Sequence, residues 1–244
     1  MEKKEVITGR NPVFEYLKSA HGNIRGELHV SSSAHGKIIN DIIGLAKSRN
    51  IKILQENRDF FKKFSSSSSH QGVALSVSIK SEKKDPELIL KNIRDKKGVI
   101  LLLDQITDPR NLGSIIRSAE ALGCGAVVLP KNNSAEITDT VIKASAGATA
   151  YMEIITISNV AQFLEDIKKD GFWIVGTSDQ GTVKIGELSD IRPSCLIIGN
   201  EGKGMRRLTE EKCDYIVSIP LKGKVSSLNA SVAAGIALYE ILKD

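Results

Sequence analysis

Cysteine and histidine are scarce, and their placement argues against a metal site. The 244 residues include 3 cysteines and 4 histidines; every histidine precedes residue 71 and every cysteine follows residue 123. No local cluster therefore has metal-ligand spacing, and we expect no metal. An odd number of cysteines in apolar or helical segments is typical of buried thiols in a reducing compartment. These cysteines are Cys124, Cys195 and Cys213.

Long apolar runs and nucleotide-binding glycine fingerprints are also absent. No apolar run approaches the roughly 18–20 residues of a membrane-spanning helix, and the opening MEKKEVITGR lacks the apolar centre of a signal peptide. We therefore expect a cytoplasmic protein with no membrane partner. No G-x-G-x-x-G follows the first strand expected in either half of the chain. Gly223-Lys224 lacks both the upstream glycine and the following Ser or Thr of a Walker A loop.

The net charge of +5 comes entirely from the N-terminal third of the chain. Residues 1–85 hold 15 Lys and Arg against 9 Asp and Glu, whereas the remainder holds 19 against 20. A basic unit joined to a near-neutral one suggests that the first part binds a polyanion, although a merely soluble surface explains the charge equally well.

Hydrophobic periodicity predicts a small N-terminal α/β unit. Asn11-Pro12 is a good helix start. Five serines at 65–69 predict a mobile loop, with folding onto RNA as the less favoured alternative. The remaining elements are strands at 26–30, 51–55 and 73–79, and helices at 37–49 and 58–64.

The polar residues 80–85 precede Pro86 and mark a domain linker. We therefore expect an RNA-binding domain at 1–80, a linker and lead-in helix at 81–97, and a second domain at 98–244.

The second domain begins with an uninterrupted apolar run at 98–103, which is typical of a strand covered on both faces. Strands and helices then alternate, which predicts an α/β fold with a parallel sheet between helices. The expected strands are 98–103, 125–129, 172–176, 195–198 and 215–220, and the expected helices are 111–122, 137–148, 159–169 and a last one from 227.

Two loops follow neighbouring strands in the C-terminal part. Gly199-Asn200-Glu201-Gly202-Lys203-Gly204 has three glycines in six positions, so its backbone must approach something closely. Residues 221–226 form the second loop. Because ligands of open α/β sheets bind beyond the carboxyl ends of strands, these loops predict a binding crevice.

Polar residues after the 98–103 strand have both functional and structural interpretations. Arg117 could bind a phosphate through its planar guanidinium, or it could pair with Glu120 on the helix surface. Asn111 could belong to the site or could simply cap the helix.

The two C-terminal loops carry further candidates. Glu201 is accessible between glycines, but it could merely stabilise a turn. A helix needs only one N-cap residue, so capping explains either Ser227 or Asn229. The other residue then has no capping role and is a candidate for the site.

Three motifs, in this order, resemble the signatures of the SpoU-type ribose methyltransferases of the SPOUT superfamily. The similarity spans about residues 98–243, and the opening Gly9-Arg10-Asn11-Pro12-Val13 further resembles the bacterial TrmH-family group that methylates a guanosine ribose in 23S rRNA. The motifs are Asp108-Pro109-Arg110-Asn111-Leu112-Gly113 with Arg117, then Gly199 to Gly204, then Ile219-Pro220 through Ser227-Leu228-Asn229.

The resemblance implies a fold that general topology rules would not suggest. It implies a C-terminal SPOUT parallel-sheet domain with a deep trefoil knot, a small N-terminal ribosomal-protein-like RNA-binding domain, and a homodimer. It also implies S-adenosylmethionine as methyl donor. The implied reaction is methyl transfer to the ribose 2′-hydroxyl of a guanosine in large-subunit rRNA.

The resemblance also assigns roles to residues. Gly199, Ile219 and Leu228 would contact the cofactor, largely through backbone groups. Arg117 is proposed in the family as a general base, but a guanidinium pKa above roughly 12 makes phosphate binding at least as good a role. The implied catalytic positions are Asn111, Arg117, Glu201, Ser227 and Asn229.

Three other functions remain open. Within the family, a tRNA ribose methyltransferase is an alternative. A non-catalytic RNA-binding ribosome-assembly factor is disfavoured because the motifs are intact. A nucleotide-dependent oxidoreductase fits the alternating pattern but lacks the glycine fingerprint.

Overall fold

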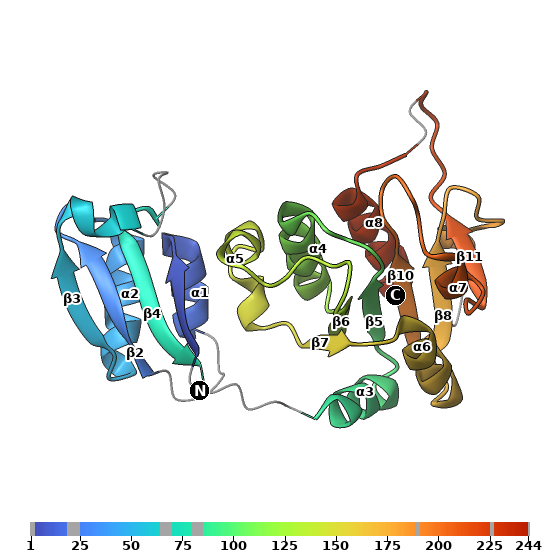
Figure 1. Ribbon diagram of the computed structural model, residues 1–244, viewed down its shortest axis with the longest axis horizontal. Coiled ribbons are helices and arrows are strands. Elements are labelled where there is room, and N and C mark those ends of the chain that lie inside the picture. The colour runs from blue at the N-terminus through green and yellow to red at the C-terminus, as the bar shows by residue number, and fades with distance from the viewer. Residues whose placement is uncertain are drawn as a thin grey trace. The chain divides into compact units, whose positions relative to one another are not determined.

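The computed structural model describes residues 3–18, 25–63, 70–79, 85–188, 191–224 and 227–243, and Figure 1 shows its elements. The chain forms two compact units, Met1–Lys83 with Ile137–Tyr151 and Lys84–Glu136 with Met152–Asp244. The serine run at 65–69 and residues 80–84 of the expected linker lie outside the described residues.

A four-stranded sheet of order β1-β4-β2-β3 forms the first unit. β4 (Val73–Ile79) is antiparallel to β1 (Lys3–Thr8) and β2 (Arg25–Ser31), whereas β3 (Lys52–Glu56) is parallel to β2. The helices α1 (Arg10–Lys18) and α2 (Lys37–Ser48) supply the rest of the buried core. That core includes Ile7, Val13, Leu28, Ile42 and Leu75.

Most expected elements of this unit are confirmed within one or two residues. The expected helix at 58–64 is the 3-10 helix η1 (Arg58–Lys63), as far as the structure describes it. The strand β1 was not predicted, because it begins with the charged residues Lys3-Lys4-Glu5 and so shows no alternation of apolar and polar residues there. It belongs to the first unit together with α5 (Asp139–Ala144) and the 3-10 helix η3 (Ala148–Ala150).

A seven-stranded sheet of order β7-β6-β5-β10-β8-β11-β9 forms the second unit, and all its pairings are parallel. The predicted parallel α/β sheet is therefore confirmed, but β7 and β9 were not predicted. Its strands are β5 (Val99–Leu103), β6 (Ala126–Pro130), β7 (Ile154–Ile157), β8 (Trp173–Thr177), β9 (Val183–Lys184), β10 (Ser194–Ile198) and β11 (Tyr215–Ser218).

Helices cover both faces of this sheet (Figure 1). On one face α3 (Pro86–Asp95) and α6 (Val160–Lys169) pack on alternate strand residues such as Ile100 and Ile197. On the other, α4 (Pro109–Ala121) packs on β6, and α8 (Ala230–Leu242) packs on α4 and β10. The short helices η4 (Ile185–Glu187) and α7 (Arg207–Glu210) complete the unit.

The structure rules out one of the two interpretations of Asn111, and it corrects the length of one expected helix. The cap of α4 is Asp108, whose carboxylate accepts from the backbone N–H of Arg110 at 2.8 Å, so Asn111 lies inside the helix. The helix expected at 137–148 is shorter, because Ala146 and Gly147 adopt positive φ values of 52° and 92° that end it.

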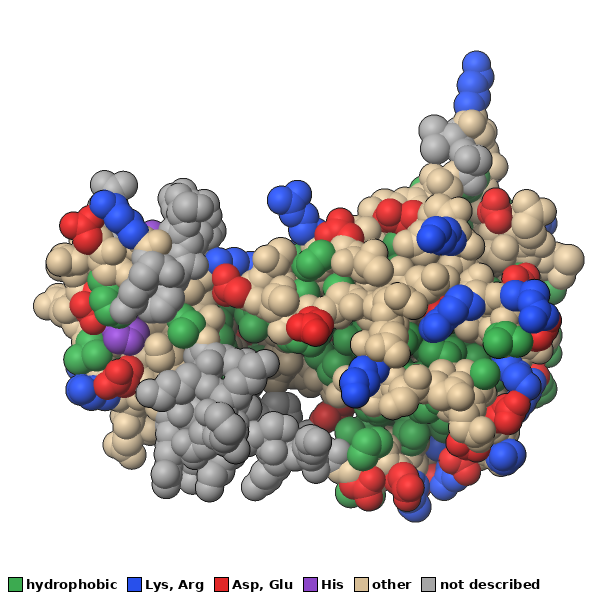
Figure 2. Space-filling view, in the orientation of Figure 1, with side chains coloured by type: hydrophobic (Ala, Val, Ile, Leu, Met, Phe, Trp, Pro, Cys, Tyr) green, Lys and Arg blue, Asp and Glu red, His purple; other side chains and the backbone are tan. Residues whose placement is uncertain are grey.

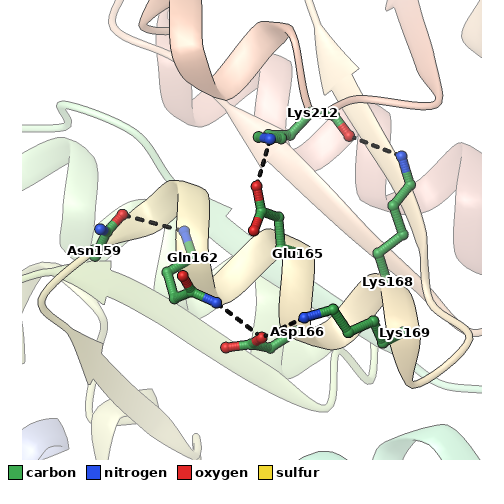
Figure 3. Close-up of polar contacts among 7 residues, drawn as sticks. All are labelled: Asn159, Gln162, Glu165, Asp166, Lys168, Lys169 and Lys212. Atoms are coloured by element: carbon green, nitrogen blue, oxygen red, sulfur yellow. Dashed lines mark hydrogen bonds and ion pairs between the residues drawn. The ribbon is translucent and has the colours of Figure 1, made fainter.

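The polar face of α6 is tied to the segment that follows α7 (Figure 3). Lys212 Nζ donates to the Glu165 carboxylate, and Lys168 Nζ donates to the Lys212 carbonyl at 3.2 Å. The bond from Lys212 holds the pKa of Glu165 below its usual range. Because these side chains are partly exposed, such pairs add little stability. Basic and acidic side chains are likewise interspersed over the second unit in the view of Figure 2.

The three cysteines are free, and Cys124 and Cys195 are buried. Burial raises the pKa of Cys124 and of Cys213 to about 12, and it raises the pKa of Cys195 as well. All three thiols are therefore protonated at neutral pH, which fits a structural role. Within the described ranges, we find no group of three His, Cys, Asp or Glu placed to hold a metal ion. No described helix is long and apolar enough to cross a membrane.

Candidate active site

The carboxyl ends of β5, β10, β8 and β11 meet at one edge of the parallel sheet. Ile198 at the end of β10 pairs with Leu103 at the end of β5, and on the other side Ile197 pairs with Gly176 of β8. Thr177 is in turn opposite Val217 of β11. The loops that leave these strands therefore start side by side, as the sequence predicted.

A hydrogen-bonded cluster joins the three motif segments. Glu201 Oε1 accepts from Asn111 Nδ2 at 2.9 Å, from Asn229 Nδ2 at 2.7 Å and from the backbone N–H of Ala230 at 2.9 Å. Asn229 Nδ2 also lies 3.0 Å from Asn111 Oδ1. Residues from the start of α4, the loop after β10 and the start of α8 are thus held together by one carboxylate oxygen.

Asn229 has a second role, as the cap of α8. Its Oδ1 accepts from the backbone N–H of Ser231 at 3.0 Å and from the Ser231 hydroxyl at 2.6 Å. Capping is therefore assigned to Asn229 rather than Ser227. Ser227 is exposed, and it forms no hydrogen bond with another described residue.

The glycine-rich loop is folded back on itself by Asn200. Its Oδ1 accepts from the backbone N–H groups of Gly202 and Lys203, at 3.0 and 3.1 Å. Its Nδ2 donates to the Gln105 carbonyl after β5 at 3.1 Å, and its backbone pairs with that of Gly204. The loop is therefore pinned to the end of the central strand.

A buried ion pair anchors the end of this loop. Asp104 is fully buried, and its carboxylate accepts from the backbone N–H of Arg206 at 2.9 Å and from Arg206 Nε at 2.7 Å. Arg206 Nη2 lies 2.6 Å from the same carboxylate. Sequence reasoning missed this pair. The position of Asp104 directly after a buried strand was a usable signal, whereas nothing local distinguishes Arg206 from its neighbour Arg207.

Gly199 and Gly176 are glycines because other atoms occupy the space of a side chain. A Cβ on Gly199 would lie 2.4 Å from the Gly204 carbonyl carbon and 2.5 Å from the Met205 nitrogen. A Cβ on Gly176 would lie 2.6 Å from Met205 Cε. Ile219 and Leu228 are half-buried, and the Thr177 hydroxyl donates to the Ile197 carbonyl at 2.9 Å.

Arg117 does not join the polar cluster. Six residues separate it from Asn111, which corresponds to about 240° around the helix and about 9 Å along it. It is exposed and makes no hydrogen bond or ion pair with any residue that the structure describes, Glu120 included. Its neighbour Ser118 faces α8, because Ser118 Oγ lies 3.8 Å from the position of a Cβ on Gly235.

Comparison with known proteins gives two family matches, one for each part of the chain. The model of the SpoU rRNA Methylase family matches residues 98–239, and the model for RNA 2′-O ribose methyltransferase substrate binding matches residues 6–83. A protein of Staphylococcus saprophyticus named as a TrmH family tRNA/rRNA methyltransferase is 38% identical over 239 residues, which cover 98% of this chain and 95% of that protein.

Solved structures agree with these matches. The SpoU methyltransferase AviRb from Streptomyces viridochromogenes has a TM-score of 0.80 and 25% identity, with 98% of this chain and 89% of that chain covered. The same protein in complex with the cofactor AdoMet gives a TM-score of 0.79 and 24% identity, with the same coverage.

Proposed function

Because the chain belongs to the SpoU rRNA methylase family, we propose that it transfers a methyl group from S-adenosylmethionine to the ribose 2′-hydroxyl of a guanosine in large-subunit rRNA. Methyl transfer to RNA is the activity for which the family and its relatives are named. The observation that carries the proposal is the cluster of Asn111, Glu201 and Asn229, which joins all three motif segments at the carboxyl edge of the sheet.

The chain's residues fit S-adenosylmethionine, a ligand without phosphates. No side chain fits at Gly199, so the loop offers backbone groups there, and Ile219 and Leu228 add half-buried apolar surface. Such a lining suits an adenine ring and a thioether chain, with backbone groups fixing orientation. The bound cofactor supplies a methyl group on a sulfonium, which is already electrophilic.

Gly199→Ala should weaken S-adenosylmethionine binding by at least about tenfold, since the new Cβ would force the backbone at Gly204 and Met205 to move. Gly202→Ala is the matched control, because the nearest atom to its Cβ would be Asn200 Oδ1 at 3.7 Å. Isothermal titration calorimetry of both variants checks this. Equal affinities would show that the tight packing at Gly199 does not shape the cofactor site.

The remaining catalytic work is positioning and charge stabilisation. The Glu201 cluster fixes the start of α8 and the loop before it, where Ser227 would orient the ribose. Arg117 has an unpaired guanidinium among the described residues, and it would bind an RNA phosphate and support the developing alkoxide.

The RNA substrate is supported by the N-terminal unit. Residues 6–83 match the substrate-binding model, and the basic excess of the chain lies in the same region. We assign RNA binding to residues 1–80, the linker and lead-in helix to 81–97, and methyl transfer to 98–244. An rRNA substrate would be consistent with a cytoplasmic protein, because bacterial ribosomes are made in the cytoplasm.

Strand order supports a trefoil knot in the second unit. After β8 the chain returns to the centre of the sheet, because β10 lies between β5 and β8. The loop after β10 then bends back to the end of β5 through Asn200 and Arg206. We propose that the C-terminal segment passes through this loop to form the knot.

A homodimer is supported by an apolar stripe on α8. Val232, Ile236 and Tyr239 recur at helical spacing and are 48%, 37% and 58% exposed. A second copy seated on this stripe would also lie beside α4, which packs on α8 and carries Arg117. We propose that the dimer brings Arg117 of one copy to the cluster of the other.

Ile236→Glu should convert the dimer to a monomer, because a charge would enter the buried contact. Light scattering coupled to size-exclusion chromatography measures the mass. Leu208→Glu, at an exposed apolar residue of α7, should leave the mass unchanged. If both variants remain dimers, the dimer interface does not lie on α8.

The substrate assignment can be tested with labelled S-adenosylmethionine and with total rRNA and tRNA from a strain that lacks the gene. We expect label in one guanosine of large-subunit rRNA, mapped by ribose-methylation-sensitive sequencing. Label found only in tRNA would show that the protein is instead a tRNA ribose methyltransferase. Binding of RNA and cofactor without any label would favour the non-catalytic assembly factor.

A further inference from the structure

The first unit contains an open cavity of about 520 Å³ at the point where β2 ends and α1 and β4 begin. None of the three sequence motifs lies in it. Its lining combines a cation, hydroxyl groups and flat rings, contributed by Arg10, Ser31, Ser33, Phe61, His70 and Gln71.

Arg10 is held at the cavity by Gln71. The backbone N–H of Arg10 donates to Gln71 Oε1 at 3.1 Å, and Arg10 Nε donates to the Gln71 carbonyl at 3.2 Å. Arg10 forms no ion pair with a described residue, so no carboxylate there neutralises its charge. A positioned guanidinium with an uncompensated charge is suited to binding a phosphate group.

His70 forms a flat wall of the cavity. Its ring stacks on the fully buried ring of Phe61, with centroids 5.1 Å apart and planes 19° apart. Its Nδ1 accepts from the backbone N–H of Gly72 at 3.0 Å, so the neutral ring carries its proton on Nε2. The stacking on Phe61 and the bond from Gly72 thus fix the orientation of this wall.

The floor of the cavity is tightly packed and polar. Ser31 is 5% exposed, and its Oγ lies 3.0 Å from Ser33 Oγ. Gly72 has a φ of 74°, and a Cβ there would lie 3.1 Å from Ser31 Cβ and 3.2 Å from Ala34 Cβ. The shape of the site is therefore set by the fold rather than by a movable side chain.

We propose that this cavity binds one unstacked nucleotide of the RNA substrate, with its phosphate on Arg10 and its base and ribose against His70 and the serine hydroxyls. The inference rests on the proposed RNA substrate and adds a binding site remote in sequence from the methyl-transfer motifs. Single-stranded RNA is recognised through such a combination of a basic group, stacking on flat side chains and hydrogen bonds to base edges and the 2′-hydroxyl.

The test measures binding of the full-length protein to transcribed 23S rRNA at several salt concentrations. Arg10→Gln should weaken binding about tenfold and lower the slope of log affinity against log salt by about one, because one phosphate contact is lost. His70→Ala should weaken binding about tenfold without changing that slope, because it removes stacking and no charge. S-adenosylmethionine affinity and thermal midpoint report whether each variant is folded.

Lys47→Gln is the matched control. Lys47 is an exposed cation in the last turn of α2, about 15 Å along that helix from its first residue. If Arg10→Gln and Lys47→Gln weaken RNA binding equally, the cavity has no special role and the inference is overturned. If the wild type methylates RNA and both cavity variants bind it normally, the inference fails while the proposed function stands. Absence of methyl transfer by the wild type would instead count against the proposed function.

Discussion

Arg117→Ala should lower the rate of methyl transfer by about 10²–10³-fold, the loss typical of removing one preorganised group that stabilises transition-state charge. The fold and S-adenosylmethionine binding should be retained, because Arg117 is exposed and bonds to no described residue. Single-turnover kinetics with saturating cofactor separate the chemical step from binding.

Two comparisons make this result interpretable. Arg207→Ala removes another exposed arginine, at the start of α7, whose ion-pair partner among the described residues is Glu211, and it should leave the rate nearly unchanged. Arg117→Lys keeps the charge but not the planar fork, so it should recover only part of the lost rate. Near-normal turnover of Arg117→Ala would remove this residue from the mechanism.

Arg206→Ala should lower the free energy of unfolding by about 3–5 kcal/mol, since it leaves the fully buried Asp104 carboxylate without its cation. S-adenosylmethionine binding should fall as well, because the end of the glycine-rich loop loses its anchor on β5. Urea denaturation followed by circular dichroism gives the stability, and calorimetry gives the affinity.

Substitution of Asp104 should lower the free energy of unfolding less than substitution of Arg206. Asp104→Asn should lower the free energy of unfolding by about 1–3 kcal/mol. The loss is smaller because a neutral amide needs no cation and because the partly exposed Arg206 side chain can reach water. The adjacent Arg207→Ala serves again as control and should change stability by less than about 1 kcal/mol. Equal losses for Arg206→Ala and Arg207→Ala would show that the buried pair does not anchor the loop.

Local patterns were sufficient to predict the elements whose residues alternate or repeat within a short window. The apolar run of β5 and the stripe of α2 are strong signals of this kind. The three glycines of the 199–204 loop predicted a close approach of the backbone, which the structure shows at Gly199 but not at Gly202 or Gly204. The parallel sheet followed from these patterns. The grouping of Asn111, Glu201 and Asn229, which the structure joins by hydrogen bonds, was implied by the family resemblance rather than by local patterns.

Other features depend on contacts between residues that are far apart in the sequence, so no short sequence segment predicts them. The two-residue strand β9 exists only because β11 pairs with it, and the Asp104–Arg206 pair joins residues 102 positions apart. Capping was one of two open interpretations of Asn111; the cap is Asp108, and Pro109 at the first turn favours it. Arg117 was grouped with Asn111 by its motif, whereas helical geometry separates them.

The most direct test of the central claim is the chemical position of the transferred methyl group. RNA labelled by the protein from radioactive S-adenosylmethionine would be hydrolysed in alkali, which cleaves next to a free 2′-hydroxyl but not next to a methylated one. We predict that the label appears in an alkali-resistant dinucleotide and, after enzymatic digestion, in a 2′-O-methylated guanosine. Label recovered in a mononucleotide with a methylated base would contradict the account.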